Sequence, residues 1–374
     1  MGELRVLLAG GGSAGHVNPL LATADEIRRR HPGSTVEVLG TETGLEKDLV
    51  PAAGYPLTFI PRARLPRRPS PELFTLPVRL RDAIRTTADV IDRVRPDVIV
   101  GFGGYVATPA YRAAFARAIP VVIHEQNARP GLANRYGARQ ADVVALTFAS
   151  TPLAARHGRT VVTGLPLRGP VAELATRRAR GAGDAARQEA ARILGLDPDR
   201  PTLLVTGGSL GAASINAAAA GALPRLAGTA QVLHLTGRGK AEPVRAAHAA
   251  AGSPSSYHIR EYLGEMHLAY ACADLVVTRS GAGMVSELAA LGLPALYVPL
   301  PVGNGEQRLN ASDVVAAGGG EVVDDATLTA DWLAERAAAL FADPGAIREM
   351  GQRAARTGAR DGAARLAEEI EALA

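Results

Sequence analysis

Two glycine-rich turns, one in each half of the chain, constrain the fold more than any other feature. The first is GGGSAGHVNP at 10–19, after the apolar run 4–9, and the second is GGSLGA at 207–212, after the run 202–206. Each turn stands between a strand-like run and an amphipathic stretch, which predicts a helix whose first backbone N–H groups are free to receive a phosphate. Two such units in one chain predict two nucleotide-type α/β domains.

Strand-like and helix-like segments alternate along both halves, and this alternation predicts parallel, doubly wound sheets. In the first half we expect strands at 4–9, 35–39, 57–60, 97–100, 120–124, 142–147 and 160–163, and helices near 17–30, 43–52, 76–95, 106–117 and 130–139. In the second half we expect strands at 202–206, 230–235, 257–260, 274–277, 295–298 and 321–323, with helices between them. The tail 344–373 is typical of two helices.

The chain is long enough for two domains, since domains commonly span about 100–200 residues. We place a hinge near Gly164–Pro170, where the sequence reads GLPLRGP. The prediction is an N-terminal domain over 1–165 and a C-terminal domain over 166–357, with a last helix at about 358–374 that packs back on the first domain. We assign no element to the polar, Gly/Ala/Arg-rich stretch 177–187.

Composition narrows the class of protein. Hydrophobic residues make up 47% and aromatic residues 4% of the chain, a balance typical of an α/β protein and unlike a disordered or collagenous one. The one cysteine, Cys272, excludes a disulfide framework and suits a reducing cytosol. No signal peptide is visible, and no apolar run approaches the ~18–20 residues that a membrane span needs.

A dinucleotide site is one interpretation of the first turn. Such a unit carries Asp or Glu at the end of its second strand to bind the ribose. Here that strand ends Val-Leu-Gly at 38–40, and Glu42 lies beyond it. The turn also holds His16, which the helix dipole keeps neutral and therefore able to act as a general base or to bind an acceptor sugar. The alternative is that His16 only orders the turn.

Polar residues follow two further strands of the first half. GFGGY at 101–105 and HEQN at 124–127 each come directly after an apolar run. Ligands of open α/β sheets bind at the carboxyl ends of the strands, so these two loops and the first turn are expected to line one crevice. We interpret His124, Glu125, Gln126 and Asn127 as a segment that contacts a ligand.

A third cluster lies in the second half, in RSGAGMVSELAALGLPALYVP at 279–299. The residues 280–283 open a helix and offer another N-terminus that favours an anion. Glu287 follows in the next turn, where a carboxylate suits two hydrogen bonds to a ribose diol, although a solvated helical Glu is the alternative. Gln307 and Asn310 are spaced i, i+3 and are expected to face the same way.

Positive charge is concentrated in one segment of the first half. Residues 1–165 carry 21 Lys and Arg against 14 Asp and Glu, whereas the whole chain has a net charge of only +4. Much of the excess lies in 60–85, where arginines alternate with apolar residues. This pattern favours contact with an anionic membrane surface over a nucleic-acid site, and the alternative is a solvated loop before a helix whose apolar face is core. The residues expected at the membrane are Arg64, Leu65, Arg67, Arg68, Leu73 and Phe74.

The motifs together resemble the MurG family of peptidoglycan glycosyltransferases, which add N-acetylglucosamine to lipid I. The resemblance covers nearly the whole chain and rests on six segments in the right order: GGGSAGHVNP, HEQN, GLPLR at 164–168, GGSLGA, SGAGMVSE at 280–287 and EQRLNA at 306–311. It implies an α/β GT-B fold, with two Rossmann-like parallel-sheet domains and a deep interdomain cleft. It also implies the substrates UDP-N-acetylglucosamine and undecaprenyl-diphospho-muramoyl-pentapeptide.

Roles for individual residues follow from the same resemblance. The catalytic base would be His16 first and Glu125 second. The acceptor would contact His16, Gly103, Gly104, Tyr105, His124, Glu125 and Asn127. The donor would contact Ser13, Ala14, Gly15, Asn127, Arg168, Ser209, Leu263 through its backbone, Ala282, Gly283, Met284, Val285, Ser286, Glu287 on the ribose, and Gln307.

The resemblance implies an inverting transfer with UDP as the leaving group. An Asp-x-Asp pattern could bind a metal, but the one at 197–199 precedes a strand and is typical of a turn. We therefore expect no tightly bound metal or cofactor. Stimulation by Mg²⁺ stays open. The expected location is the cytoplasmic face of the cell membrane as a peripheral protein, with other cell-wall synthesis proteins as further partners and no nucleic acid.

Other functions remain as alternatives at this point. A glycosyltransferase that acts on a soluble aglycone and a non-hydrolysing UDP-sugar epimerase share the architecture, but neither requires the basic segment 60–85. A nicotinamide-dependent oxidoreductase is disfavoured by the missing acid at the end of the second strand. A non-catalytic sugar-binding module would need no paired domains.

Overall fold

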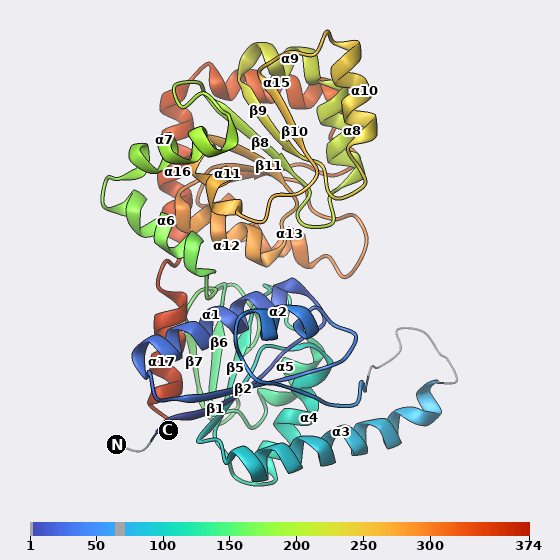
Figure 1. Ribbon diagram of the computed structural model, residues 1–374, viewed down its shortest axis with the longest axis vertical. Coiled ribbons are helices and arrows are strands. Elements are labelled where there is room, and N and C mark those ends of the chain that lie inside the picture. Colours follow the sequence, from blue (N-terminus) through green and yellow to red (C-terminus); the bar gives the residue numbers. More distant parts are fainter. Residues whose placement is uncertain (1–2, 64–71) are drawn as a thin grey trace. The chain divides into compact units, whose positions relative to one another are not determined.

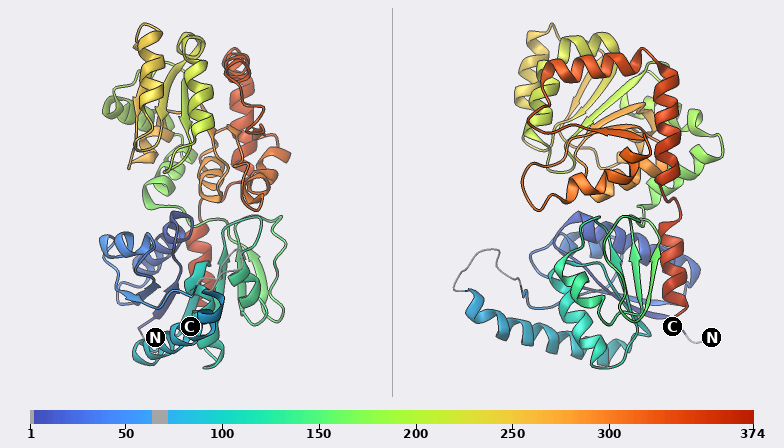
Figure 2. Two further views of the ribbon diagram at one scale, coloured as in Figure 1. Left: turned by 90° about the vertical axis from the view of Figure 1, so that its right-hand side faces the viewer. Right: turned by 180° about the vertical axis from the view of Figure 1, so that it is seen from behind.

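The computed structural model describes residues 3–63 and 72–374, and these form two compact units, each with one parallel sheet. Unit 1 comprises Met1–Arg168 and Asp361–Ala374, and unit 2 comprises Gly169–Arg360. In each unit, helices cover both faces of the sheet (Figures 1 and 2). Two parallel-sheet α/β units are the architecture that the alternation predicts, and this prediction is confirmed.

The sheet of unit 1 has the strand order β3-β2-β1-β4-β5-β6-β7, with every neighbouring pair parallel. Its strands are β1 (Arg5–Ala9), β2 (Thr35–Gly40), β3 (Leu57–Phe59), β4 (Val98–Gly101), β5 (Val121–Glu125), β6 (Val143–Leu146) and β7 (Arg159–Val162). Its helices are α1 (Ala14–Arg30), α2 (Glu46–Ala52), α3 (Glu72–Val94), α4 (Gly104–Phe115), α5 (Leu132–Gly137) and α17 (Gly362–Glu371).

The sheet of unit 2 repeats this pattern with the order β10-β9-β8-β11-β12-β13, again parallel throughout. Its strands are β8 (Thr202–Thr206), β9 (Gln231–Leu235), β10 (Tyr257–Arg260), β11 (Leu275–Thr278), β12 (Ala295–Tyr297) and β13 (Gly320–Val322). Its helices are α6 (Gly169–Ala179), α7 (Gly183–Leu194), α8 (Ala213–Gly221), α9 (Leu223–Thr229), α10 (Glu242–Ala250), α11 (Met266–Cys272), α12 (Ala282–Leu291), α13 (Glu306–Asn310), α14 (Ser312–Ala316), α15 (Ala330–Phe341) and α16 (Pro344–Thr357).

The strand predictions are confirmed within a residue or two at each end, because parallel strands buried on both faces are continuous apolar runs. The helix predictions are less accurate. Two helices, α6 and α7, overlap the stretch 177–187, to which we assigned no element. The buried face of α7 consists largely of alanine, which carries little hydrophobic signal, and α6 buries only Val171, Leu174 and Ala175. Helices α1 and α3 also begin three and four residues earlier than the predicted 17 and 76.

The chain returns to unit 1 at its end. Leu366 and Ile370 of α17 are fully buried in the same core as Val6 and Leu20. Glu371 accepts hydrogen bonds from the side chains of two α1-end residues, Arg30 at 2.7 Å and His31 at 2.9 Å. Helix α17, in red, lies beside α1, in dark blue, in Figure 1.

The two sheets place the motif-bearing loops in equivalent positions. In each unit the strand order reverses between two neighbouring strands, β1 and β4 in unit 1 and β8 and β11 in unit 2. Loops that leave the carboxyl ends of such a strand pair diverge and form the usual ligand crevice of an open α/β sheet. Both glycine-rich turns leave one of these strands.

A buried histidine in each sheet holds neighbouring loops. His124 in β5 donates from Nε2 to the carbonyl oxygen of Gly164 at 3.0 Å. His234 in β9 is bonded through Nδ1 to the Tyr257 hydroxyl at 2.8 Å and through Nε2 to Asn216 Oδ1 at 3.1 Å. Burial disfavours the charged imidazolium and lowers the pKa of each ring to about 4.

We therefore expect each unit to lose stability as the pH falls from 6.5 to 4. Above pH 6.5 these histidines are neutral in the folded and in the unfolded protein. Between pH 6.5 and about pH 4 they are protonated in the unfolded protein but stay neutral in the folded one, so protonation favours unfolding. The loss is about 3 kcal/mol for each histidine. Urea unfolding at pH 7 and pH 4.5 measures it. His124→Gln and His234→Gln should each flatten the pH dependence, whereas exposed His157→Gln should not; equal pH dependence in all variants would contradict the prediction.

Candidate active site

Two loops of unit 1 approach each other so closely that only glycine fits between them. Gly103 and Gly104 have φ values of +86° and +78°, a region that side chains rarely adopt. A Cβ atom on Gly104 would lie 2.8 Å from the carbonyl oxygen of Gly11. The loop after β4 therefore lies directly against the first glycine-rich turn, and this contact brings Gly103, Gly104 and His16 close together.

His16 lies in the first turn of α1 and is half-buried. The carbonyl oxygen of the N-cap residue Ser13 accepts the His16 N–H at 3.1 Å, and the Ser13 hydroxyl lies 3.1 Å from His16 Nδ1. A Cβ on Gly103 would lie 3.4 Å from His16 Nε2. Because Ser13 engages Nδ1, Nε2 is the ring atom turned toward the loop after β4.

Glu125, at the end of β5, organises the loop that follows it. Its Oε1 accepts the Asn127 N–H at 3.0 Å, and its Oε2 accepts the Gly131 N–H at 3.0 Å and the Asn134 side-chain amide at 2.9 Å. The carboxylate is 2% exposed, and desolvation raises its pKa in spite of these bonds. A carboxylate that accepts these N–H groups, and the Asn127 side chain as well, shapes the 125–134 loop, which makes it a weaker candidate for the base than His16.

The other predicted acceptor residues serve different purposes. His124 is fully buried and turned toward Gly164. The Asn127 carbonyl oxygen accepts the Thr151 hydroxyl at 3.2 Å. The ring of Tyr105, at the start of α4, lies 5.4 Å from the guanidinium carbon of Arg62, a cation–π contact. Arg168 is half-buried and is the last residue of the first segment of unit 1.

The second glycine-rich turn is held tightly by its neighbours. Gly208 and Gly211 have φ values of +80° and +66°. Lys240 donates from Nζ to the carbonyl oxygen of Leu210 at 2.8 Å, from the loop after β9. Within the described residues, the backbone N–H groups of Ser209 and Leu210 donate to no acceptor, and both residues are exposed. This turn therefore presents the open amides that a phosphate needs.

Glu287 lies on α12 and is 8% exposed. Its Oε2 accepts the hydroxyl of Tyr270 of α11 at 2.7 Å, which orients the carboxylate. Ser286 beside it is buried, and its hydroxyl has no hydrogen-bond partner among the described residues. A buried carboxylate and an unpartnered hydroxyl in successive positions form a polar pair suited to a ligand with hydroxyl groups.

Two further predicted donor residues of the same unit are Gln307, on α13, and Leu263, in a loop. Gln307 accepts the Leu300 N–H through Oε1 at 2.9 Å, whereas buried Asn310 donates to the Ser280 carbonyl oxygen at 3.3 Å. The two side chains thus bond different loops. The backbone segment that contains Leu263 connects β10 to α11. Asp197 Oδ1 accepts the Asp199 N–H at 2.9 Å, so the Asp-x-Asp pattern forms a turn.

Sequence reasoning missed several residues that build this site. Glu46 bonds the first turn, Asn134 bonds Glu125, and Tyr270 orients Glu287. Arg279 donates to the carbonyl oxygens of Val298 and Pro299 and to the Ser214 hydroxyl, and it pairs with Asp325. Glu46, Asn134 and Tyr270 stand outside the glycine motifs, whereas Arg279 opens the segment 279–299 but received no role. For Glu46 and Arg279 the available signal was a charged residue within or beside an apolar run, which is rarely buried without a partner.

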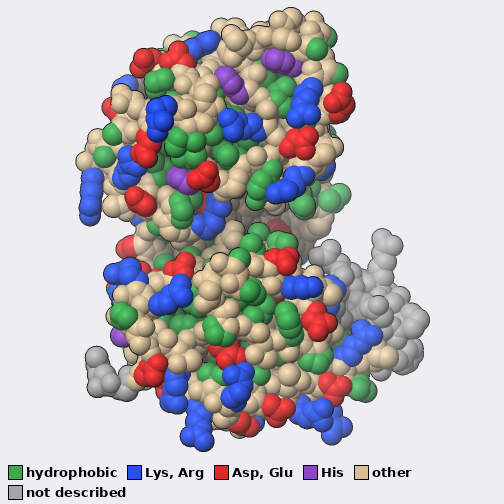
Figure 3. Space-filling model, viewed as in Figure 1, with side chains coloured by type: hydrophobic (Ala, Val, Ile, Leu, Met, Phe, Trp, Pro, Cys, Tyr) green, Lys and Arg blue, Asp and Glu red, His purple; other side chains and the backbone are tan. Residues whose placement is uncertain are grey.

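The predicted membrane residues are only partly visible. Arg64, Leu65, Arg67 and Arg68 lie outside the described residues, and Leu73 and Phe74 fall in the first turn of α3. No described helix has both the length and the apolarity to cross a membrane. On the face of the molecule in Figure 3, Lys and Arg side chains are interspersed with Asp and Glu.

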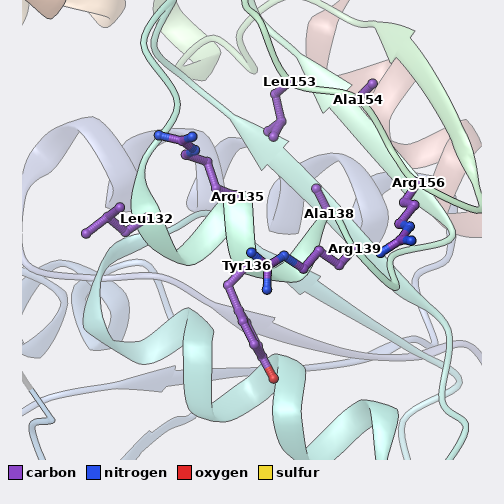
Figure 4. Close-up of a pocket in the computed structure, with 8 residues that line it drawn as sticks. All are labelled: Leu132, Arg135, Tyr136, Ala138, Arg139, Leu153, Ala154 and Arg156. Atoms are coloured by element: carbon purple, nitrogen blue, oxygen red, sulfur yellow. The ribbon is translucent and has the colours of Figure 1, made fainter.

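A hollow of about 470 Å³ lies on unit 1, away from these loops (Figure 4). It is formed by α5 and the segment between β6 and β7. Its lining residues are Leu132, Arg135, Tyr136, Ala138, Arg139, Leu153, Ala154 and Arg156. None of these belongs to the predicted acceptor or donor set, so the hollow contributes nothing to the site described above. Among the described residues no group of three His, Cys, Asp or Glu is arranged to hold a metal ion.

Comparison with known proteins identifies the family of both units. Residues 6–146 match the glycosyltransferase family 28 N-terminal domain, and residues 202–366 match the glycosyltransferase family 28 C-terminal domain. The chain is 54% identical, over 97% of its length and 96% of the relative's, to a Nocardioides protein named UDP-N-acetylglucosamine--N-acetylmuramyl-(pentapeptide) pyrophosphoryl-undecaprenol N-acetylglucosamine transferase.

Solved structures agree with this comparison. The crystal structure of Acinetobacter baumannii MurG superposes with a TM-score of 0.78 and 27% identity, covering 99% of each chain. A UDP-GlcNAc 2-epimerase from Neisseria meningitidis superposes with a TM-score of 0.69 at 15% identity over 99% of this chain and 100% of its own, and so shares the fold alone. The chain belongs to the MurG family of glycosyltransferases, and its two parallel-sheet units have the GT-B fold.

Proposed function

We propose that this chain transfers N-acetylglucosamine from UDP-N-acetylglucosamine to the muramoyl 4-hydroxyl of undecaprenyl-diphospho-muramoyl-pentapeptide, which gives lipid II. Support comes from relatives of 46–54% identity that carry the name of this transferase. The observation that carries the proposal beyond the family name is the buried Glu287 carboxylate, oriented by Tyr270 on a helix that begins with a glycine N-cap.

Unit 2 supplies the donor contacts in this proposal. Glu287 accepts hydrogen bonds from the ribose hydroxyls, and the Leu263 backbone contacts the uracil. The open amides of Ser209 and Leu210 and the N-terminus of α12 face the diphosphate, since helix N-termini and free amides favour anions. Gln307 contacts the sugar, and Ser13, Ala14, Gly15, Asn127 and Arg168 of unit 1 complete the donor set.

Unit 1 supplies the base. The acceptor hydroxyl oxygen attacks the anomeric carbon in line with the bond to UDP. As the new bond forms, the hydroxyl proton passes to His16, and UDP leaves with the electron pair, so that the anomeric centre is inverted. A neutral His16 with its proton on Nδ1 donates to the Ser13 hydroxyl, which leaves Nε2 as the proton acceptor. Arg168 and the helix N-termini balance the charge that develops on the diphosphate.

Two rival functions differ in what they need from these residues. An epimerase uses the same donor but no acceptor, so it gives no role to the acceptor loops that meet at Gly104. A nicotinamide enzyme needs an acid at the end of β2 and open amides in the first turn. That strand ends at Gly40, and the Gly12 N–H of that turn is bonded to Glu46. A glycosyltransferase that acts on a soluble aglycone differs from the proposed enzyme only in its acceptor.

The donor site is tested first. Glu287→Gln should weaken UDP binding by about 10- to 150-fold, because it removes a charged acceptor of hydroxyl hydrogen bonds worth about 1.5–3 kcal/mol. Isothermal titration with UDP measures the change, and Glu265→Gln, an exposed residue on the same unit, is the control. Unchanged affinity in the Glu287 variant would remove it from the donor site, and micromolar affinity for NAD would favour the oxidoreductase.

The transfer itself is tested with His16→Ala. The wild-type protein should form a disaccharide product from labelled UDP-N-acetylglucosamine and a soluble lipid I analogue, detected by mass, in parallel reactions with and without Mg²⁺. Loss of the base should lower turnover by ~10²–10⁴-fold with little change in UDP affinity. Normal turnover in the variant would assign His16 a structural role, and absence of product from the wild type would refute the proposed acceptor.

Membrane attachment is the finer part of the proposal. We infer that unit 1 meets the cytoplasmic face of the membrane as a peripheral protein, near the segment 60–85. The described part of this segment supports the inference. Arg79, Arg81 and Arg85 on α3 are exposed, and none of them pairs with a carboxylate within the described residues. Val78 among them is 62% exposed, so apolar and basic side chains alternate on this helix.

Replacing Arg79, Arg81 and Arg85 with Ser should lower binding to phosphatidylglycerol vesicles by about one to two decades, since a basic residue near an anionic surface contributes about 1 kcal/mol. Cosedimentation at low salt measures this, and the difference should shrink at high salt. The triple Ser variant of Arg180, Arg192 and Arg200, exposed on unit 2, makes the same change in charge and should bind normally. Wild-type protein that ignores anionic vesicles would contradict the membrane proposal and favour a soluble aglycone.

A further inference from the structure

A buried carboxylate underlies the first glycine-rich turn. Glu46, the first residue of α2, is fully buried. Its Oε2 accepts the backbone N–H of Gly12 at 2.7 Å, and its Oε1 accepts the Thr41 N–H at 2.9 Å and the Thr41 hydroxyl at 2.8 Å. Both oxygens are therefore engaged, one by the turn and one by the end of β2.

The turn is shaped around this carboxylate. A Cβ atom on Gly11 or on Gly44 would overlap the Glu46 carboxyl group, so two glycine backbones form the walls of its slot. No Lys or Arg of the described residues pairs with Glu46. Its charge is balanced instead by three N–H and O–H donors and by the N-terminal ends of two helices, α2 itself and α1, which begins two residues after Gly12.

The bond to Gly12 occupies a position that nucleotide-binding turns use for phosphate. In a phosphate-binding turn the backbone N–H groups between strand and helix point at the anion. Here a side-chain carboxylate of the same unit receives the Gly12 N–H. The expectation that the N–H groups of the first turn are all free is therefore wrong, because the Gly12 N–H donates to Glu46. In the second turn the N–H groups of Ser209 and Leu210 donate to no acceptor within the described residues.

The hydrogen bond between Glu46 and Gly12 is connected to His16 through Ser13. Gly12, with φ of +90°, precedes Ser13, whose carbonyl oxygen accepts the His16 N–H at 3.1 Å and whose hydroxyl lies 3.1 Å from His16 Nδ1. On the other side, the carbonyl oxygen of Gly11 is pressed against Gly104. The turn that carries His16 is thus fixed between α2 and the loop after β4, and Glu46 holds its backbone from the side of α2.

We propose that Glu46 is a positioning residue for the transfer reaction: its carboxylate fixes the turn at Gly12 and thereby sets the position of His16. The proposal rests on the role of His16 in the proposed function. Glu46 touches neither His16 nor the donor contacts of unit 2, so its removal should lower turnover far more than it weakens donor binding. Displacement of a catalytic group by about 1 Å can lower the rate by about 10²-fold.

The test compares Glu46→Gln with Glu42→Gln. The amide that replaces the Glu46 carboxylate keeps one acceptor oxygen but turns an NH₂ group toward an N–H donor, so the bond to Gly12 or the bonds to Thr41 are lost. Glu42 is an exposed residue in the same loop and serves as the matched control. Glu46→Gln should lower kcat by about 10- to 100-fold, with the KM for UDP-N-acetylglucosamine changed by less than about threefold.

A second measurement does not depend on activity. Amide hydrogen exchange of a peptide that spans 10–17 should be faster in Glu46→Gln than in the wild type, because the Gly12 N–H either loses its acceptor or bonds a side chain that Thr41 no longer fixes. Glu42→Gln should match the wild type in both measurements. Faster exchange together with lowered kcat supports the proposal. Wild-type exchange, or wild-type kcat, in Glu46→Gln overturns it.

Thr41→Val decides the question if Glu46→Gln does not fold. This variant removes one hydroxyl donor from Oε1 and leaves the bond to Gly12 in place. Moderately faster exchange of the 10–17 peptide with a several-fold lower kcat supports the proposal, and wild-type values for both overturn it. If the wild-type protein forms no product at all, the proposed function fails, whereas the exchange experiment still reports whether Glu46 holds the turn.

Discussion

The candidate site depends on buried carboxylates that accept backbone N–H groups from loops at the carboxyl ends of buried strands. Such loops contain glycine and leave amides without partners in the sheet. The buried carboxylates need these donors, because an unsatisfied buried polar group costs about 1–3 kcal/mol. In unit 1, Glu46 satisfies the amide of Gly12, and Glu125 satisfies those of Asn127 and Gly131. These bonds order the first turn, just before the helix that carries His16, and the loop that follows Glu125.

The two units use one architecture for different chemistry, and the difference lies in how their glycine-rich turns are completed. Both turns follow a central strand at the point where the strand order reverses. The first is filled by the Glu46 carboxylate and places a histidine at a helix N-terminus. The second has its carbonyl oxygen at Leu210 bonded by Lys240 and leaves amides exposed. In the proposed function, the first turn, with the Glu46 carboxylate beneath it, helps to activate the acceptor. The second turn, with Lys240 beside it, binds the diphosphate of the donor.

Side chains of the second unit illustrate how a donor site acquires rigidity. Tyr270 bonds Glu287, and Arg279 connects the ends of β11 and β12 with the start of α8 through Ser214. Ser286 keeps a buried hydroxyl without a partner among the described residues. The hydroxyls of Ser280 and Tyr297 in the same unit are also buried without a partner among the described residues. Native proteins rarely bury an unpartnered hydroxyl unless a ligand or a water completes it.

The sequence by itself determined the strands, their parallel arrangement in two sheets and the loops on which the chemistry falls. Continuous apolar runs followed by glycine are local signals, and the MurG motifs are contiguous segments. Only the tertiary structure decided what Glu46, Glu125, His124 and Glu287 bond to. Their partners lie in other loops or elements, often many residues away, and which carboxylate or imidazole is buried depends on how separate loops pack. Helix α7 escaped prediction for a related reason: its buried face is largely alanine, and such a helix is stabilised by the surface that it covers, which does not exist until the chain has folded.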